Sequence, residues 1–224
     1  MGKYVGGLIP LGVLLTAVTF IVSVVVYFRH EREPDELHQR FLARFYVYVM
    51  LFFSVLLVFI GSVFLLRGVL SYPFGLSFSY TGSVMLKERA PGETPASVEV
   101  RCDSRERLID IAGGLMLGVV GVVFYAVHRS LEKRVEPPQL SPHSFLKQSY
   151  LMSSTVLYGG MAIYGIPVSI YSILERYLIH TEISGENHLA RPVPGTILSV
   201  AIVALPIWIL FIRELQTVWR SSGG

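Results

Sequence analysis

The chain has 224 residues, of which 52% are hydrophobic and 16% are charged, and its mean hydropathy is +0.56. A soluble domain carries about 25% charged residues, so this composition indicates a membrane protein. The small net charge of +3 does not indicate nucleic-acid binding, and the single cysteine, Cys102, excludes an internal disulfide bond.

The first apolar segment covers residues 8–28, whose polar side chains are two threonines and one serine. It ends in aromatic and basic residues rather than in the small residues of a signal-peptide cleavage site. We therefore predict an uncleaved first span. The connector 29–44 is rich in charge, and Pro34 suits the first turn of a helix that leads into the next segment.

The most apolar part of the chain is the segment 45–66, and no charged side chain lies between Arg44 and Arg67. As a helix it would be about 33 Å long. The hydrocarbon core of a bilayer is about 30 Å thick, so the segment has the length of a transmembrane helix. The sequence thus predicts an integral membrane protein.

The longest polar stretch covers residues 71–107. Residues 76–80 alternate between apolar and polar, residues 97–101 do so in part, and a proline- and glycine-rich turn lies between them. This pattern predicts a small β-hairpin or extended cap outside the bilayer.

Three further apolar segments complete an all-α fold of five transmembrane helices in a single membrane domain. They cover residues 108–128, 150–174 and 195–212. The third of the five spans contains Gly114 and Gly118, a spacing that lets helices approach closely. The fourth is rich in small and hydroxyl side chains, and we expect Gly160 and Gly165 to serve helix packing as well.

Five spans place the two termini on opposite sides of the membrane. The short connectors 29–44 and 129–149 each carry four Lys or Arg residues, and the tail adds Arg213 and Arg220. Since short cytoplasmic loops are enriched in basic residues, the sequence favours an N-terminus outside and a cytoplasmic C-terminus.

The second and third spans resemble the fourth and fifth in outline, which indicates two repeated helix pairs and one extra first helix. An offset of 84 residues places Phe124 on Trp208 and Arg129 on Arg213. Chance similarity of apolar segments is the alternative explanation. Parallel duplications of this kind are common in membrane proteins.

Two motifs at the ends of these pairs resemble a known family. The sequence RFYVY at residues 44–48 opens one span, and LPIWIL at residues 205–210 precedes Arg213. They are similar to the RRLYLYLV-like entry and the GLPLWLLHWRWAQR-like exit of a bacterial multi-pass membrane family known only as a domain of unknown function. The resemblance covers the last four spans and implies membrane location and repeated helix pairs, with no catalytic residue. Phe211 and Ile212 depart from it, because the family has His-Trp there.

Candidate cofactor ligands are His30 and His128, which the predicted topology places at the inner membrane face. Two imidazoles on facing helices are able to ligate a haem or a metal, or to bind a quinone. The alternative is that both are interfacial residues next to lipid headgroups. Asp35 and His38, three residues apart, are residue types that ligate divalent cations. Such pairs also occur in charged connectors that are simply solvated.

Two other groups of residues have a functional and a structural interpretation. Asp110 lies one turn into its span, and an acidic residue inside a membrane span is a candidate functional residue. The structural alternative is that Asp110 reaches water at the membrane surface or caps the helix. Tyr158, Tyr164 and Tyr171 would line a cavity or permeation path, or would serve helix packing. Cys102 is either a loop residue or the site of an intermolecular disulfide.

No nucleotide-binding, nucleophile-elbow or zinc-protease motif occurs in the sequence. We therefore expect no enzymatic activity, no catalytic residue, no metal site and no cofactor. The sequence favours a scaffold, anchor or accessory subunit of a membrane complex. Its partners would be lipids and other membrane subunits or further copies of itself. The alternatives are a small channel, transporter or lipid-binding protein that uses the polar fourth span, and a haem- or quinone-binding electron-transfer subunit.

 The expected location of the chain is the bacterial cell membrane.

Overall fold

The computed structural model describes residues 35–80, 83–85, 99–101, 104–135, 145–178 and 193–222. The first predicted span, residues 8–28, and His30 lie outside the described residues, as does Cys102. Asp35 and His38 lie in the first turns of the first described helix, where only the backbone is described.

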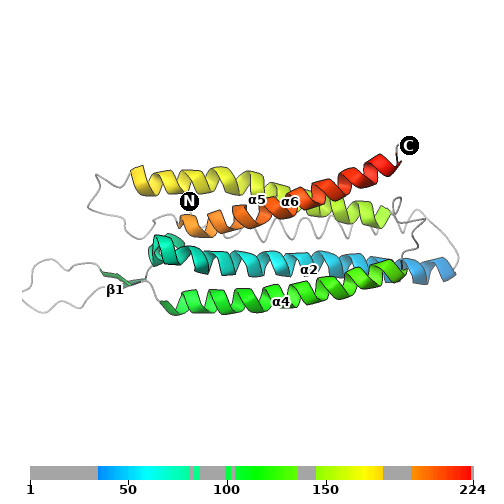
Figure 1. Cartoon of the computed structure of the whole chain (residues 1–224), viewed down its shortest axis with the longest axis horizontal. Coiled ribbons are helices and arrows are strands. Elements are labelled where there is room, and N and C mark those ends of the chain that lie inside the picture. The colour runs from blue at the N-terminus through cyan, green and yellow to red at the C-terminus, as the bar shows by residue number, and fades with distance from the viewer. Residues whose placement is uncertain are drawn as a thin grey trace, which may run out of the picture.

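Four long helices make up most of the described chain and run along one common axis (Figure 1). They are α2 (Asp35–Phe74), α4 (Ser104–Val135), α5 (Phe145–Leu178) and α6 (Pro194–Ser222). Each contains a stretch long and apolar enough to cross a membrane. The prediction of an α-helical integral membrane protein is thereby confirmed for these four helices.

Each helix extends beyond the span that its apolar residues predicted. α2 starts ten residues before the predicted segment 45–66 and ends eight residues after it. α4 continues past residue 128 to Val135, with Lys133 and Arg134 in its last turn. Basic side chains are favoured there, because the helix dipole is negative at the C-terminus. Hydropathy marks the part of a helix inside lipid, whereas backbone hydrogen bonding continues into polar sequence.

The segment after α2 corrects one prediction. Residues 76–80 were expected to be extended, but α3 (Leu76–Ser79) is a single helical turn, separated from α2 by Gly75. Gly75 has a φ of 85°, which glycine adopts without steric cost. Phe78, Ser79 and Tyr80 are all buried, so the burial of this segment does not follow the alternation of its sequence.

Two short strands follow α3. β1 (Ser83–Met85) pairs antiparallel with β2 (Glu99–Arg101), and Val84 lies opposite Val100. The residues between the strands, 86–98, lie outside the described residues. The predicted cap therefore stays a prediction as a whole.

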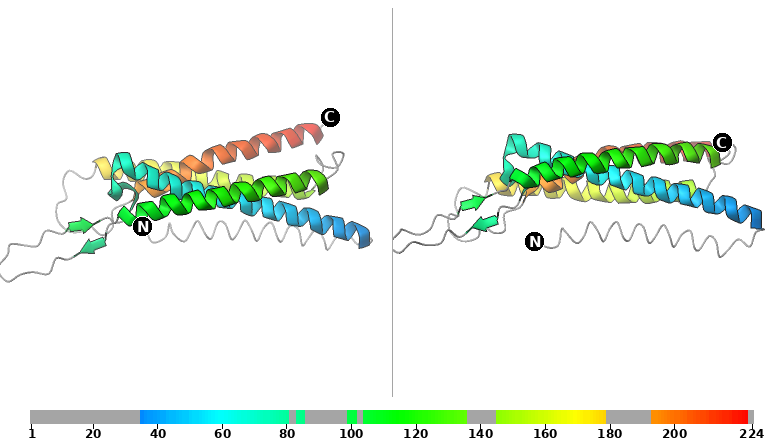
Figure 2. Two further views of the ribbon diagram at one scale, coloured as in Figure 1. Left: turned by 60° about the horizontal axis from the view of Figure 1, so that its bottom comes forward. Right: turned by 90° about the horizontal axis from the view of Figure 1, so that it is seen from below.

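The four helices form two antiparallel pairs. α2 packs mainly against α4, and α5 packs mainly against α6. α2 also contacts α5 and α6, so it joins the two pairs, while α4 lies at the edge of the described bundle (Figure 2).

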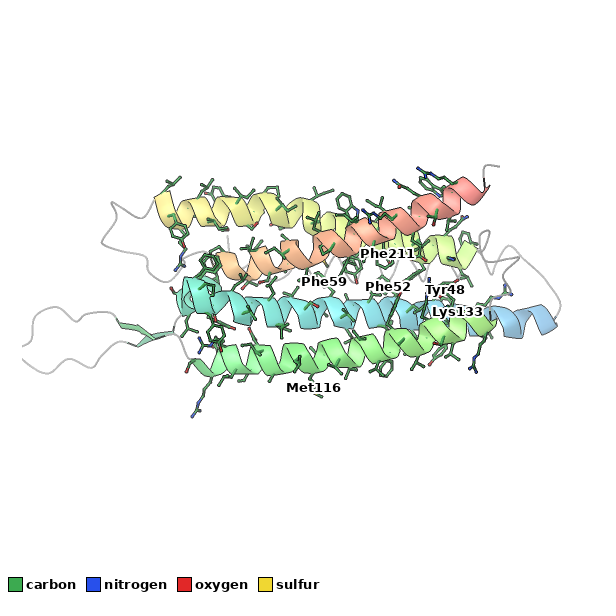
Figure 3. The ribbon with its side chains drawn as sticks, viewed as in Figure 1. Tyr48, Phe52, Phe59, Met116, Lys133 and Phe211 are labelled. Carbon is green, nitrogen blue, oxygen red and sulfur yellow. The ribbon has the colours of Figure 1, made fainter. Side chains whose placement is uncertain are left out.

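The apolar core lies between α2 and the α5–α6 pair. Phe52 and Phe59 of α2 and Phe211 of α6 point into it (Figure 3). Met116 of α4 points away from the bundle and is 70% exposed.

Candidate functional site

The contact between α2 and α4 is made by backbone against backbone. A methyl group built on Gly61 would lie 2.5 Å from the backbone nitrogen of Gly118 and 2.7 Å from the carbonyl oxygen of Gly114. One built on Gly121 would lie 2.7 Å from the backbone nitrogen of Val58. No side chain fits at such distances. We call Gly61, Gly114, Gly118 and Gly121 the glycine seam.

Three of the four glycines that the sequence predicted for packing lie at helix contacts. Gly114 and Gly118 belong to the glycine seam, and Gly165 of α5 faces Ala201 of α6. Gly160 is the exception, because it is exposed and an added methyl group would meet no atom of the described residues. Its neighbour Gly159 makes the contact instead, against the indole of Trp208. One residue turns a helix by about 100°, which moves a side chain from one face to another.

A charged cluster lies at the end of the bundle where α4 and α6 finish. Arg129 donates from Nη1 to Glu132 Oε2 at 2.5 Å and from Nη2 to Glu214 Oε1 at 3.4 Å. Tyr48 of α2 donates from Oη to Glu132 Oε1 at 3.4 Å. Glu132 is only 6% exposed, so its charge depends on these partners. We call Arg129, Glu132, Glu214 and Tyr48 the Arg129 cluster.

The Arg129 cluster connects to all four helices. Its members come from α2, α4 and α6, and the ring of Tyr48 lies 5.7 Å from that of Tyr150 in α5. Tyr150 in turn meets Phe211 edge-on at 5.6 Å. The cluster thus ties the α2–α4 pair to the α5–α6 pair at this end.

Sequence reasoning missed the Arg129 cluster because Glu132 and Glu214 lie outside the apolar segments. A usable signal was present in the helical spacing. Gly121, His128 and Glu132 follow one another at intervals of seven and four residues, which places them on one face of α4, and all three are buried.

His128 lies in the α2–α4 contact and is 5% exposed. Its Nδ1 lies 2.8 Å from the carbonyl oxygen of Phe124, which accepts a hydrogen bond from it. Its ring stacks on Phe124 at 6.0 Å and lies 5.8 Å from the ring of Tyr46. With Nδ1 as donor, Nε2 is the nitrogen able to take a ligand. Within the described part of the chain, no group of three His, Cys, Asp or Glu side chains is placed to hold a metal.

A second polar cluster lies at the opposite end, around Arg67. The Nε atom of Arg67 donates to the carbonyl oxygen of Ser79 at 3.0 Å and lies 3.4 Å from Asp110 Oδ2. The Arg67 guanidinium also lies 4.4 Å from the ring centre of Tyr80. Asp110, a candidate from the sequence, is therefore paired with an arginine of α2 that also binds the turn after α2.

Tyr80 keeps its proton in this cluster. Burial raises the pKa of its phenol above the ordinary value of 10, and the neighbouring Asp110 carboxylate raises it further. The phenol is therefore neutral throughout the physiological pH range, and it does not add a second negative charge beside Asp110.

The three tyrosines predicted to line a cavity do not lie together. Tyr158 is fully buried between Phe59, at 5.4 Å, and Phe211, at 5.8 Å between ring centres. Tyr164 and Tyr171 are 46% and 61% exposed and lie on the outer side of α5. The Tyr158 hydroxyl finds no hydrogen-bond partner among the described residues.

Comparison with known protein families, with curated proteins and with solved structures finds no match to this chain. The function therefore has to be inferred from the chemistry of the described side chains. Their arrangement consists of two polar clusters at the bundle ends, a glycine seam and an aromatic core, and its buried charged groups are held in ion pairs.

Proposed function

We propose that this protein is a non-enzymatic scaffold, anchor or accessory subunit of a membrane complex. The observation that supports this proposal best is the exposure of α4. Only 11% of its most apolar stretch is buried, compared with 33% for α2 and 39% for α5. A helix that packs on one side leaves the other side for lipids or for partner helices.

The exposed side of α4 is apolar along the length of the helix. It includes Ile109, Met116, Val123 and Val127, which are 52% to 70% exposed. Its side chains offer packing surface and no hydrogen-bonding groups, which suits contact with lipid or with another apolar helix.

The charged side chains within the described helices support the same proposal. Glu132 and Asp110, whose side chains are 7% and 15% exposed, are paired with Arg129 and Arg67. A carboxylate that carries protons or ions across a membrane has to exchange partners. The Arg67–Asp110 pair joins α2 to α4, and Arg129 also joins α4 to α6 through Glu214, so these charges have a structural use.

The test is the composition of the native complex. The protein is extracted in a mild detergent, and its mass and visible absorbance are measured. We expect it to copurify with other membrane subunits or as a homo-oligomer. A monomer without partners would contradict the proposal. A Soret band from the isolated chain would favour the haem-binding alternative and assign His128 as a ligand.

A second candidate function is a channel, transporter or lipid-binding protein built around α5. It is favoured by the buried hydroxyls of Ser154 and Tyr158, which have no partner among the described residues. They lie four residues apart on one face of the helix. Reconstituted vesicles that show solute flux, abolished by Tyr158→Phe, would support this function over the scaffold.

We further propose the orientation with the Arg129 cluster in the cytoplasm. The helix ends near that cluster carry eight basic residues, namely Arg40, Arg44, Arg129, Lys133, Arg134, Lys147, Arg213 and Arg220. The opposite helix ends carry four, namely Arg67, Arg105, Arg107 and Arg176. This difference supports a cytoplasmic C-terminus.

The finer features of the sequence interpretation also remain proposals. They are a fifth span at residues 8–28, a cap within residues 71–107, a duplicated helix pair and membership of the bacterial family that the two motifs resemble. The two antiparallel helix pairs are compatible with a duplication, and cysteine-accessibility labelling on both sides of the membrane would test the number of spans.

A further inference from the structure

Three arginines meet the turn after α2 at the end of the bundle opposite the Arg129 cluster, and they differ in how their charge is used. Arg67 is bound to Asp110 and to the carbonyl oxygen of Ser79. Arg176 donates to the carbonyl oxygen and the hydroxyl of Ser77, both at 2.9 Å. The Nε atom of Arg107 is buried and has no hydrogen-bond partner among the described residues.

The Arg107 guanidinium is nevertheless held in a fixed place. It lies over the ring of Tyr72, with 4.1 Å between Cζ and the ring centre. One turn further into the bundle, a methyl group on Gly68 would lie 2.5 Å from the side chain of Ile111. This close approach of α2 and α4 brings Tyr72 and Arg107 together. A guanidinium stacked on an aromatic face is preorganised, and its outer N–H groups stay able to bind an anion.

The surroundings of this pair place it at the boundary of the membrane. Tyr72 is 60% exposed and lies in the last turn of α2. Leu108 and Ile109, directly after Arg107, are 61% and 68% exposed and begin the apolar surface of α4. Tyrosine is enriched at this depth, where its ring contacts acyl chains and its hydroxyl reaches water.

We propose that Arg107 and Tyr72 form a binding site for an anionic phospholipid. The guanidinium binds the phosphodiester of the headgroup, and an acyl chain lies along Leu108 and Ile109. Arginine matches phosphate oxygens through two parallel N–H groups, which gives a strong charge-assisted contact. The apolar surface beside Arg107 fits a lipid better than a soluble phosphate. The site is independent of the scaffold role proposed above.

The proposal is tested by native mass spectrometry of the full chain in detergent. The delipidated protein is titrated with phosphatidylglycerol and, separately, with phosphatidylcholine. We expect phosphatidylglycerol to bind more tightly to the wild type and Arg107→Gln to weaken its binding about tenfold, as expected for a hydrogen-bonded charge. Tyr72→Leu removes the aromatic face under the guanidinium and should weaken the binding as well, and unchanged binding would contradict the part that Tyr72 has in the site.

Lys133→Gln is the matched control, because it removes one positive charge from an exposed residue at the other end of α4 (Figure 3). We expect it to leave the affinity unchanged. Equal weakening by Lys133→Gln and Arg107→Gln would mean that net charge alone attracts the lipid, which would overturn the proposal. Unchanged binding to Arg107→Gln would overturn it as well.

A second variant and a second ligand complete the experiment. If Arg107→Gln does not fold, Arg107→Lys replaces it, and we expect weaker binding because lysine has no planar fork. An affinity of Arg107→Lys equal to that of the wild type would contradict the proposal. Glycerol 3-phosphate carries the phosphate without acyl chains, and if it bound as tightly as the lipid, the site would be one for a soluble anion.

Discussion

The two helix pairs are held together by different means. In the α2–α4 pair the backbones touch along the glycine seam, where Gly61 and Gly114 leave no space for a side chain. In the α5–α6 pair, the contact includes large side chains, such as Trp208 against Gly159 and Phe211 stacked on Tyr158. A seam of backbone cannot adjust to an added atom, whereas an interface of side chains can change rotamers. The first pair should therefore be the less tolerant of substitution.

This difference also concerns what each pair presents to its surroundings. Backbone contact is narrow, so α4 is held by α2 while most of its apolar surface stays exposed. The aromatic contacts of α5 and α6 are broad and extend to Phe59 of α2. The α5–α6 pair and α2 thus form the core, and α4 forms the surface best suited to a partner.

The largest loss of stability is expected from Gly61→Leu. The leucine side chain would overlap the backbone of α4. The overlap could be relieved only if α2 and α4 moved apart. We expect a loss of stability of more than about 3 kcal/mol, which is above the usual range for overpacking because backbone atoms have to move. Thermal unfolding and gel filtration in detergent measure it.

The control for this variant is Gly118→Ala, because a methyl group on Gly118 meets no atom of the described residues within 4 Å. Gly114→Ala should destabilise and Gly118→Ala should be tolerated, although both belong to one small-residue motif. Equal effects of the two substitutions would show that the seam is not packed as described.

The next largest effect is expected from Glu132→Gln in the Arg129 cluster. This change removes a buried charge and leaves Arg129 with Glu214 alone. Breaking a buried pair costs about 3 kcal/mol or more, while a half-exposed pair contributes about 1 kcal/mol or less. We therefore expect Glu132→Gln to lower the melting temperature more than Glu214→Gln does. The reverse order would assign the main partner of Arg129 to α6.

A smaller effect is expected from Gly159→Ala. The added methyl group would lie 2.5 Å from Nε1 of Trp208, which is a side-chain atom and able to move. We expect a loss of about 1 to 2 kcal/mol, as for moderate overpacking, and less than for Gly114→Ala. Tryptophan fluorescence should shift as the indole rotates. If Gly159→Ala destabilised more than Gly114→Ala, the contrast between the two pairs would be wrong.

The smallest effect belongs to Tyr158→Phe. Removing a buried hydroxyl without a partner is close to neutral or stabilising by about 1 kcal/mol, because its desolvation no longer counts against folding. A clear loss of stability would show that the hydroxyl has a partner such as a bound water. That result would favour the polar-path function over the scaffold.

Much of the fold follows from hydropathy, while the sites depend on features that hydropathy does not record. Apolar segments such as 45–66 and 108–128 predicted the membrane spans, since lipid demands long runs without charge. The glycine contacts depend on helix rotation, which decides that Gly159 faces α6 and Gly160 does not. The residues of the Arg129 cluster are 84 or 85 positions apart in the pairs Tyr48–Glu132 and Arg129–Glu214, and only packing brings them together.

The turn at residues 76–80 shows a second reason for a wrong prediction. Alternation of apolar and polar residues is the signature of a strand, but here it falls on a short helical turn, and Phe78, Ser79 and Tyr80 are buried one after another. Contact with the bundle, which places Ser79 beside Gly195 of α6, decides which of these residues are buried, and the local alternation does not record that contact.

The positions of the two polar clusters have a consequence for the choice of membrane. On α4, Asp110 and Arg129 belong to opposite clusters and are nineteen residues apart, a rise of about 29 Å. That distance is close to the thickness of an average hydrocarbon core. Thicker or thinner bilayers would force the helices to tilt or the lipid to deform, at a cost that grows with each ångström of mismatch. The separation of the two ion pairs therefore sets a preferred bilayer thickness. The folded chain should be most stable in bilayers whose hydrocarbon core is about as thick as this separation.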